Sequence, residues 1–263
     1  MLAYIKTVQQ NRQVIVALAW RAFTGRFAGT AGGFAWMIVQ PLVTVVAYWV
    51  VFTYGFKVTA ANNMPFAVYF VTGLLPWTMF SDVLSATTNA VSKNGFLVRK
   101  VRFPSEVLPL TEIAAATIPH LIFLALTLLV LLGHGYVPGW WILQLPYAFC
   151  ALFVLSLGFG FLLSALNVLH RDVSQIVPAV TGIWFWLTPL VWHLDMLPPP
   201  WRQIAALNPF LHVVEAYRAA LIYEHFAWQA PLQTAVFWIM ALLLLLLGRQ
   251  VFMSLKSEFV DVM

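Results

Sequence analysis

The sequence predicts an all-α membrane protein, on the strength of its composition, its charge-free windows and the placement of its basic residues. Of the 263 residues, 62% are hydrophobic and 9% are charged, whereas a soluble domain carries about 25% charged residues. A lipid bilayer removes the need for a charged exterior, and it favours helices because they satisfy their own backbone polar groups. The composition therefore excludes an ordinary soluble domain.

Six transmembrane helices are predicted from the stretches that contain no Asp, Glu, Lys or Arg. One span needs about 20 apolar residues. The longest charge-free stretch, 113–170, is too long for one helix, and the turn-rich patch Gly133–Gly139 divides it into two. The predicted spans are 34–56, 66–88, 112–133, 142–168, 174–194 and 230–252.

The basic residues predict the orientation of these spans. Eleven of the fourteen Lys and Arg residues fall in the N-terminal segment, the loops after the second and fourth predicted spans, and the C-terminal tail. Cytoplasmic loops carry an excess of Lys and Arg, so both termini are predicted to be cytoplasmic. The net charge of +5 is explained by this topology, and we expect no nucleic-acid partner.

Three segments are predicted not to span the bilayer. Residues 1–33 are long enough for an amphipathic helix that contacts lipid phosphates. The loop Asn89–Thr111 is basic and cytoplasmic. The outer segment Asp195–Pro231 has apolar residues three and four apart, which predicts two short re-entrant helices broken at Asn208-Pro209. We interpret 1–263 as one domain, with an interface segment 1–33, a six-span bundle 34–252 and a tail 253–263.

No motif predicts catalysis. The sequence has no Gly-Lys-Ser/Thr phosphate loop, and its six histidines are not at metal-ligand spacing. The paired intramembrane carboxylates that an ion-coupled carrier or a lipid transferase needs are also absent. We therefore expect no catalytic residue, metal or cofactor on this chain, and we expect energy for any uphill transport to come from a partner.

Aromatic residues gather on two predicted spans. Tyr48, Trp49 and Phe52 lie on the first, and Trp184–Trp186 lie in the middle of the fifth. Aromatic faces offer flat apolar surfaces on which sugar rings stack. Ordinary packing against lipid or core is the alternative, and a helix cannot direct three consecutive side chains to one side.

The order and spacing of several short motifs resemble the membrane permeases of type-2 ABC exporters, especially those for O-antigen, capsule and teichoic acid polymers. The motifs are Gly33-Phe34-Ala35-Trp36, Gln40-Pro41, Gly73-Leu74-Leu75-Pro76-Trp77, Arg171-Asp172-Val173, Leu187-Thr188-Pro189 and Leu207-Asn208-Pro209. The resemblance implies a homodimer in the bacterial inner membrane, with two separate ATPase subunits that bind ATP and magnesium. It also implies a cytoplasmic coupling helix between spans two and three. The cargo would be a lipid-linked polysaccharide, or alternatively a small lipid or drug.

Within that framework, three groups of residues are predicted to act in transport. The predicted channel residues are Tyr48, Trp49, Phe52, Trp184, Phe185 and Trp186. The predicted ATPase-coupling residues are Arg21, Arg26, Asn94, Phe96, Leu97, Arg99 and Lys100. The predicted outer gate comprises Asn208, Glu215 and Arg218, the last two of which are close enough to pair on one helix face.

Overall fold

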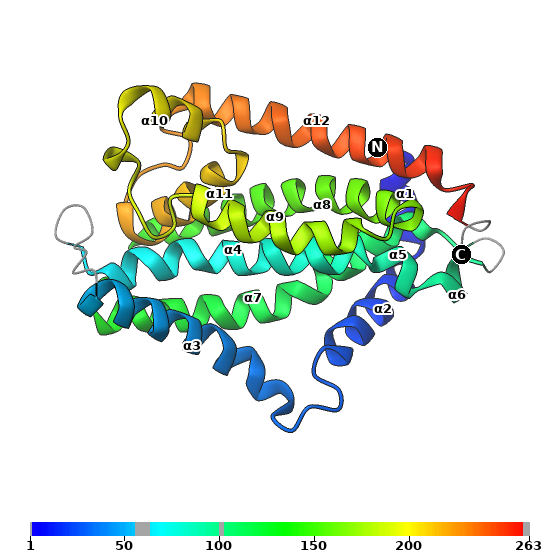
Figure 1. The fold of residues 1–263 in the computed structure, drawn as a ribbon, viewed down its shortest axis with the longest axis horizontal. Helices are drawn as coiled ribbons and strands as arrows, with labels where there is room; N and C mark the ends of the chain where they lie inside the picture. Colours follow the sequence, from blue (N-terminus) through cyan, green and yellow to red (C-terminus); the bar gives the residue numbers. More distant parts are fainter. Residues whose placement is uncertain (1, 56–63, 100–102, 260–263) are drawn as a thin grey trace.

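The computed structural model describes residues 2–55, 64–99 and 103–259, and throughout these ranges the chain is built of helices and turns without a β-strand (Figure 1). The predicted all-α class is therefore confirmed. One end of the bundle holds α1 (Leu2–Gln10) and the last turn of α12 (Pro231–Leu255), and the opposite end holds α10 (Pro199–Ala206).

Within the described ranges, five helices are long and apolar enough to cross a membrane. Two of them are the single helices α4 (Phe66–Thr88) and α12. The span Gly33–Gly55 contains α3 (Trp36–Val50) and the π-helical turn η2 (Val51–Gly55). The span Ser105–Gly133 contains η4 (Ser105–Val107) and α7 (Leu108–Gly133), and the span Trp140–Leu169 contains η5 (Trp140–Gln144) and α8 (Leu145–Leu169). Each overlaps a span predicted from the sequence.

The fifth predicted span, 174–194, is a shorter helix than expected. It is α9 (Val173–Leu187), with 15 residues, or about 22 Å at 1.5 Å per residue, against a hydrocarbon core of about 30 Å. The helix ends because Pro189 disfavours the helical conformation at the preceding residue, and Thr188 accordingly has φ −93° and ψ 134°. The predicted end at residue 194 was wrong for this reason.

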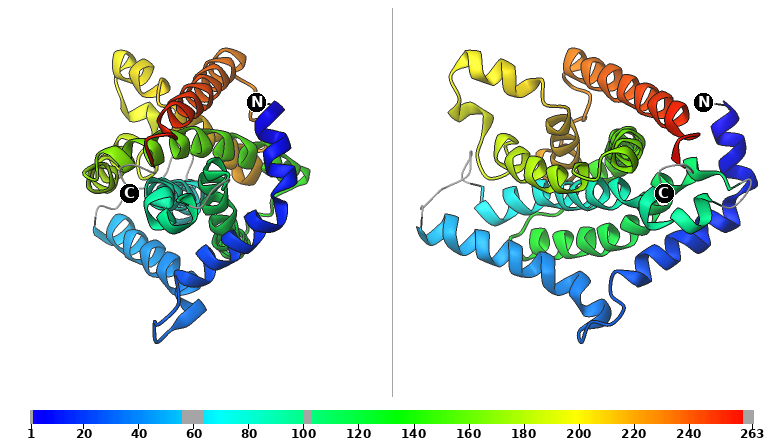
Figure 2. Two further views of the ribbon diagram at one scale, coloured as in Figure 1. Left: turned by 90° about the vertical axis from the view of Figure 1, so that its right-hand side faces the viewer. Right: turned by 45° about the vertical axis from the view of Figure 1, so that its right-hand side comes forward.

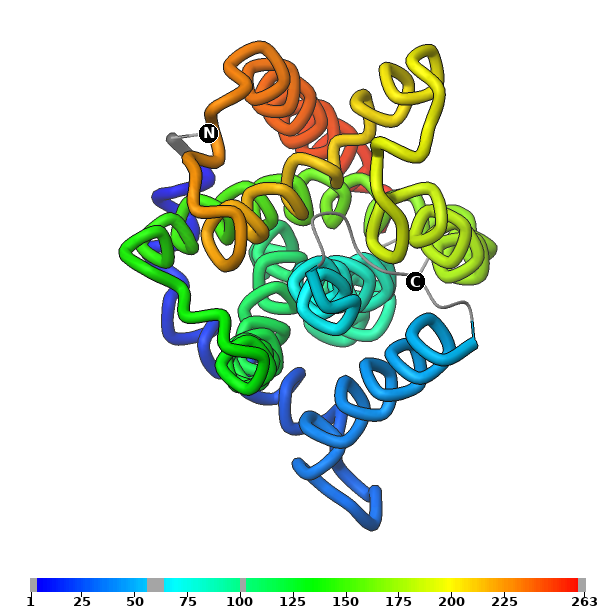
Figure 3. The backbone as a smooth tube through the Cα atoms, turned by 90° about the vertical axis from the view of Figure 1, so that its left-hand side faces the viewer, coloured from blue at the N-terminus to red at the C-terminus, as the bar shows by residue number. Residues whose placement is uncertain are grey.

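Helix α4 forms the centre of the bundle, and α7, α8, α9 and α11 (Pro209–Arg218) pack around it (Figure 3). Nearly every residue from Phe66 to Trp77 is buried. Helix α3 differs sharply, because Val45 is its one buried residue. The two views of Figure 2 show α3 along the edge of the bundle, joined to α2 (Arg12–Gly25) by a sharp corner.

Helices α8 and α12 pack with their backbones in close contact, because glycine stands on both sides of the crossing. A Cβ atom built on Gly248 would lie 2.4 Å from the carbonyl oxygen of Gly158. Small residues allow this type of close approach between membrane helices.

The segments predicted not to span are also helical. The interface segment forms α1 and α2, and α2 buries Ile15, Ala19 and Phe23 as it packs against α7. In place of the single coupling helix there are two one-turn helices, α5 (Ala90–Lys93) and α6 (Gly95–Val98). The outer segment forms η6 (Leu194–Met196), α10 and α11, which continues as the π-helical turn η7 (Ala219–Tyr223).

The end of α12 is tied back to the segment before α7. Lys256 Nζ donates a hydrogen bond to Glu106 Oε2, and Phe252 packs edge-on against Phe161 at 5.5 Å between ring centroids. Tyr4 packs on the same Phe161 ring at 5.5 Å. Burial and the nearby Glu106 carboxylate raise the pKa of the Tyr4 hydroxyl. The first helix, the segment before α7 and the end of α12 therefore form one packed unit.

Reversing either charge of the Lys256–Glu106 pair is expected to destabilise this unit. Lys256→Glu places two carboxylates together in a partly buried site, so we expect a loss of about 1–2 kcal/mol of folding free energy after solvent screening. The double variant E106K/K256E restores the attraction and is expected to regain most of that loss. Thermal unfolding of the three variants in detergent measures the effect, and a double variant as unstable as K256E would contradict it.

Candidate functional site

A groove runs along α4 between α3, α7 and α9. It consists of two adjoining cavities of about 760 Å³ and about 360 Å³. The two share five lining residues from three helices, namely Tyr48, Trp77, Ser81, Ser85 and Phe185. We call this combined cavity the α4 groove.

The floor of the α4 groove is a row of side chains along one face of α4, with Thr78 and Asp82 lining the groove beside it. Trp77, Ser81 and Ser85, with Asn89 just beyond the end of α4, follow at four-residue spacing and all line the groove, as residues on one helix face do. Gln40 adds a polar side chain from α3. The sequence reasoning missed this row, although its regular spacing in an apolar span was the signal that would have revealed it.

Aromatic rings wall the middle of the α4 groove. The ring of Tyr48 on α3 lies 5.7 Å from that of Phe185 on α9, and Phe185 lies 5.7 Å from Trp77 on α4. Trp186 also lines the groove, 6.4 Å from Tyr48. The structure thus brings together Tyr48, Phe185 and Trp186 from the predicted channel set and adds Trp77.

The other three predicted channel residues do not line the α4 groove. Trp49 packs edge-on against Tyr54 at 5.8 Å, and Phe52 stacks on Phe66 at 4.9 Å. Trp184 turns into the core against Phe80 at 5.3 Å. Consecutive residues on a helix point in different directions, which is why Phe185 and Trp184 have different surroundings.

Basic residues surround the end of the groove nearest α5. Arg26, at the end of α2, and Lys93, at the end of α5, both line it. Arg26 Nη2 lies 3.6 Å from Glu112 Oε2 of α7. Arg26, a predicted coupling residue, is therefore directed towards the groove and the bundle.

The remaining predicted coupling residues lie close to α5 and α6, apart from Arg21 on the exposed side of α2. Asn94 joins the two short helices and donates a hydrogen bond to the Ala90 carbonyl oxygen at 2.8 Å. Phe96 is 73% exposed at the tip of α6. Leu97 is half-buried and Arg99 is exposed, while Lys100 lies outside the described residues. Apart from Lys100, these residues form one surface at this end of the bundle.

At the opposite end, Arg218 is completely buried in a cage of carbonyl oxygens. Its Nη1 atom donates to Pro189 O at 3.0 Å and to Glu215 Oε1 at 3.1 Å. Its Nη2 atom donates to Leu190 O and Tyr69 O, each at 3.4 Å. The guanidinium also lies 3.6 Å from the centroid of the Tyr69 ring. One side chain therefore joins α11 to α4 and to the residues that follow α9.

The predicted Glu215–Arg218 ion pair is thus present, but the cage around it was not predicted. Gly73 makes room for the guanidinium, because a Cβ atom there would lie 2.9 Å from Arg218 Nη2. The Tyr69 hydroxyl donates to Trp192 O at 2.9 Å, which holds the chain after α9 on the same side of α4.

Asn208 joins α9 to α11. Its Oδ1 atom accepts hydrogen bonds from Phe210 N at 3.0 Å, which caps α11, and from Trp184 Nε1 at 2.9 Å. Its Nδ2 atom donates to Thr188 Oγ1 at 2.9 Å. Because the side chain uses both its oxygen and its nitrogen, Asn208 fixes the angle at which the outer helices leave the bundle.

The apolar helices and the α4 groove, with its polar side chains, are typical of a multi-pass membrane protein. Comparison with known families identifies the class more closely. Residues 13–222 match the model of the ABC-2 type transporter membrane family, and the chain belongs to this family.

Several curated proteins are similar to the chain over most of its length. It is 28% identical to the O-antigen export system permease protein RfbA of Myxococcus xanthus, over 99% of both chains. It is 25% identical to the polysialic acid transport protein KpsM of Escherichia coli, over 81% of this chain and 82% of KpsM. It is 26% identical to the capsule polysaccharide export inner-membrane protein CtrC of Neisseria meningitidis serogroup B, over 80% of this chain and 79% of CtrC.

Proposed function

We propose that this chain is the permease subunit of an ABC exporter that moves a lipid-linked polysaccharide across the bacterial inner membrane. The observation that carries the proposal is the α4 groove, which combines aromatic walls with a floor of hydroxyl and amide groups. The three relatives described above are named for O-antigen, polysialic acid or capsule polysaccharide. These names favour a polymer over a small lipid or drug as the cargo.

The groove meets the physical requirement that a sugar polymer imposes. Each hydroxyl left without a partner in hydrocarbon costs several kcal/mol, so the polymer needs a protein-lined route. Ser81, Ser85 and Gln40 offer hydrogen bonds along this route, and Tyr48 and Phe185 offer flat apolar faces. A chain sliding past such groups exchanges one set of contacts for another.

A second copy of the chain would close the open side of the α4 groove. Helix α3 is almost entirely exposed, and α9 exposes Ile176, Val180 and Ile183 on its outer side. A homodimer that packs these two helices at its seam covers both surfaces and converts two grooves into one channel.

The proposed topology has six crossings and both termini in the cytoplasm. The remaining crossing consists of α9 and the turns at residues 188–193 that follow it. The described chain begins and ends at the same end of the bundle (Figure 1), which agrees with an even number of crossings. The basic residues near α1, α5 and α6 make this end the cytoplasmic one, with α10 and α11 as outer, re-entrant gate helices.

Energy comes from a separate ATPase subunit, which binds ATP and magnesium. Its docking site comprises α5, α6 and the neighbouring face of α2, with Arg21, Phe96 and Arg99 exposed on that surface. Arg26 extends from the same region to the groove, where its ion pair with Glu112 connects the docking site to α7.

Removing the aromatic wall tests the transport proposal. In cells that also express the partner ATPase, the Y48A/F185A variant is expected to lose polysaccharide at the cell surface. Two lost aromatic contacts of about 0.5–1.5 kcal/mol each correspond to a decrease in export rate of roughly 5- to 150-fold. Dimer assembly and binding of the ATPase are expected to remain normal. The matched control is W49A, on the same helix but outside the groove lining, and equal export by both variants would contradict the proposal.

Site-directed cross-linking tests the docking surface. Because Cys150 is the only native cysteine, the C150S background allows a single thiol to be placed at Phe96. We expect F96C to cross-link to the ATPase subunit through a short bifunctional reagent. Leu143 is 76% exposed at the other end of the bundle, so L143C is a control of similar exposure that is expected to give no product. Cross-linking from L143C but not F96C would reverse the proposed orientation.

A further inference from the structure

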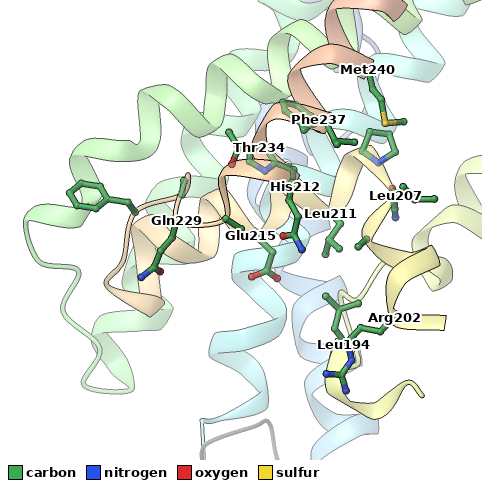
Figure 4. Close-up of a pocket in the computed structure, with 18 of the residues that line it drawn as sticks. Leu194, Arg202, Leu207, Leu211, His212, Glu215, Gln229, Thr234, Phe237 and Met240 are labelled. Carbon is green, nitrogen blue, oxygen red and sulfur yellow. The ribbon is translucent and has the colours of Figure 1, made fainter. Parts of the chain in front are cut away.

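A second cavity lies on the far side of α11 from the α4 groove. It has a volume of about 450 Å³ and is enclosed by α10, α11, the segment before α12 and the first turns of α12 (Figure 4). This volume falls in the range of roughly 300–1,000 Å³ that is typical of small-molecule sites. We call it the outer cavity. Helix α11 separates the two sites, since it buries Phe210, Val213 and Tyr217 in the bundle and lines the outer cavity with His212 and Glu215.

The polar groups of the outer cavity suit a neutral ligand with hydroxyl groups. Gln229 and Gln233 line it, and both side chains are exposed, so their amides are accessible to a ligand. An amide presents both donors and an acceptor, which matches a sugar hydroxyl that donates and accepts. Figure 4 places the carboxylate of Glu215 between Gln229 and Arg202.

The charges of the outer cavity argue against a phosphate or another anion. Asp195, Glu215 and Arg202 sum to one negative formal charge. The single positive side chain is already paired, because Arg202 Nη1 lies 3.2 Å from Asp195 Oδ1. Glu215 is likewise paired, with Arg218 Nη1 at 3.1 Å, so the lining presents no uncompensated positive charge to an anion, whereas a neutral polyol needs none.

An aromatic ring belongs to the same lining as these amides. Phe226 lines the outer cavity and is 41% exposed. Its ring stacks on Trp228 at 5.1 Å and meets Trp141 edge-on at 5.0 Å, which fixes its orientation. A fixed flat ring next to amide groups is the combination that binds the two faces of a sugar, its C–H face and its hydroxyl edge.

The cavity wall is held in place before any ligand arrives. Gln144 is 5% exposed, and its side chain donates to His225 O and accepts from Ala227 N, both at 2.9 Å. The Tyr147 hydroxyl lies 2.9 Å from His212 Nε2. Because these bonds fix the loop and α11, little ordering is required when a ligand binds.

We propose that the outer cavity binds a neutral sugar unit of the exported chain, an inference that rests on the function proposed above. Gln229 and Gln233 exchange hydrogen bonds with sugar hydroxyls, Glu215 accepts one, and the Phe226 ring covers the C–H face. Asn208 lines the outer cavity and also accepts a hydrogen bond from Trp184 of α9, the helix whose next residue, Phe185, lines the groove. A weak site in this position retains each sugar briefly as the polymer leaves the groove.

Saturation-transfer difference NMR on the purified full chain tests the proposal. The probes are D-galactose, D-mannose, L-rhamnose and N-acetyl-D-glucosamine. We expect saturation transfer to at least one sugar, and a roughly tenfold weaker affinity in Q229A/Q233A, the effect of losing one or two hydrogen bonds. The matched control is Q203A, an exposed glutamine on α10 outside the cavity lining, which is expected to bind normally.

Three results would overturn the outer sugar site: no transfer to any of the four sugars, equal transfer in Q229A/Q233A and wild type, or displacement of the sugar by inorganic phosphate. A parallel experiment separates this failure from failure of the proposed function. The Y48A/F185A variant is expected to lose export but to keep the part of the sugar binding that depends on Gln229 and Gln233, whereas Q229A/Q233A is expected to bind sugar roughly tenfold more weakly and to slow export several-fold. Normal export by wild type without sugar binding refutes the outer site alone, and absence of polysaccharide export by wild type with its ATPase refutes the function.

Discussion

Replacing Arg218 with alanine is expected to abolish export and to destabilise the outer half of the bundle. The guanidinium is the hydrogen-bond donor for the carbonyl oxygens of Pro189 and Leu190, and the substitution leaves these buried groups without that partner. It also leaves a void over the Tyr69 ring. A hydrogen bond to a charged group contributes roughly 1.5–3 kcal/mol, and Arg218 makes several, so this is one of the largest single effects expected for the protein.

Tryptophan fluorescence during thermal unfolding in detergent measures the stability, and surface polysaccharide measures export. R218K is expected to recover only part of the stability, because a lysine ammonium cannot bridge several carbonyls and stack on a ring as guanidinium does. Arg202 is an exposed arginine in an ion pair, so R202A is the stability control and is expected to change the unfolding free energy by less than about 1 kcal/mol. An R218A protein as stable as R202A would show that the cage is not structural.

Replacing Gly248 with leucine is expected to disrupt the packing of α12 on α8. The added Cβ atom would lie 2.4 Å from a backbone oxygen of Gly158, which cannot rotate away as a side chain does. Overpacking typically costs about 1–3 kcal/mol and more where the neighbours cannot move, so we expect a value at or above the top of this range. The two helices must separate, and the end of α12 then leaves its contact with Glu106.

The yield of monodisperse protein after detergent extraction, together with its thermal unfolding, checks this prediction. Gly133 ends another long apolar helix, α7, and a Cβ atom there meets no atom within 4 Å. G133A is therefore the matched control and is expected to fold normally. Normal yield and unfolding of G248L would mean that the helices cross elsewhere.

Much of the fold was predictable because only apolar, charge-poor segments are stable as helices in the hydrocarbon core of a membrane. A long stretch without charges, such as 113–170, is stable in a bilayer only as membrane-spanning helices, and the ends of these helices follow from the first charged or turn-forming residues. The end of α9 was mispredicted because residues 188–194 are also apolar. The end of α9 is determined by the effect of Pro189 on the backbone of Thr188 and by Arg218, which donates a hydrogen bond to the carbonyl oxygen of Pro189. Hydropathy detects neither effect.

The site was less predictable, because composition does not say which side of a helix faces which neighbour. The sequence shows an aromatic cluster at 184–186, but only the packing of α9 on α4 distinguishes Phe185, which lines the groove, from Trp184, which packs on Phe80. Likewise, Ser81 and Ser85 resemble ordinary small residues of a membrane helix until α3 and α9 leave that face of α4 open. The Glu215–Arg218 pair was foreseen from local spacing, whereas its partners Tyr69 and Pro189 are distant in sequence.

The poor packing of α3 has a consequence for how the protein is made. Lipid tails solvate an apolar helix as well as other helices do, so an inserted α3 gains little by docking onto its own subunit. In the proposed homodimer, newly synthesised chains would therefore complete the α4-centred bundle first and acquire the final position of α3 only when the second copy binds. Substitutions at exposed α3 positions such as Val43 or Val46 should then leave the folding of single chains intact and appear as slow maturation, with orphan subunits exposed to membrane proteases.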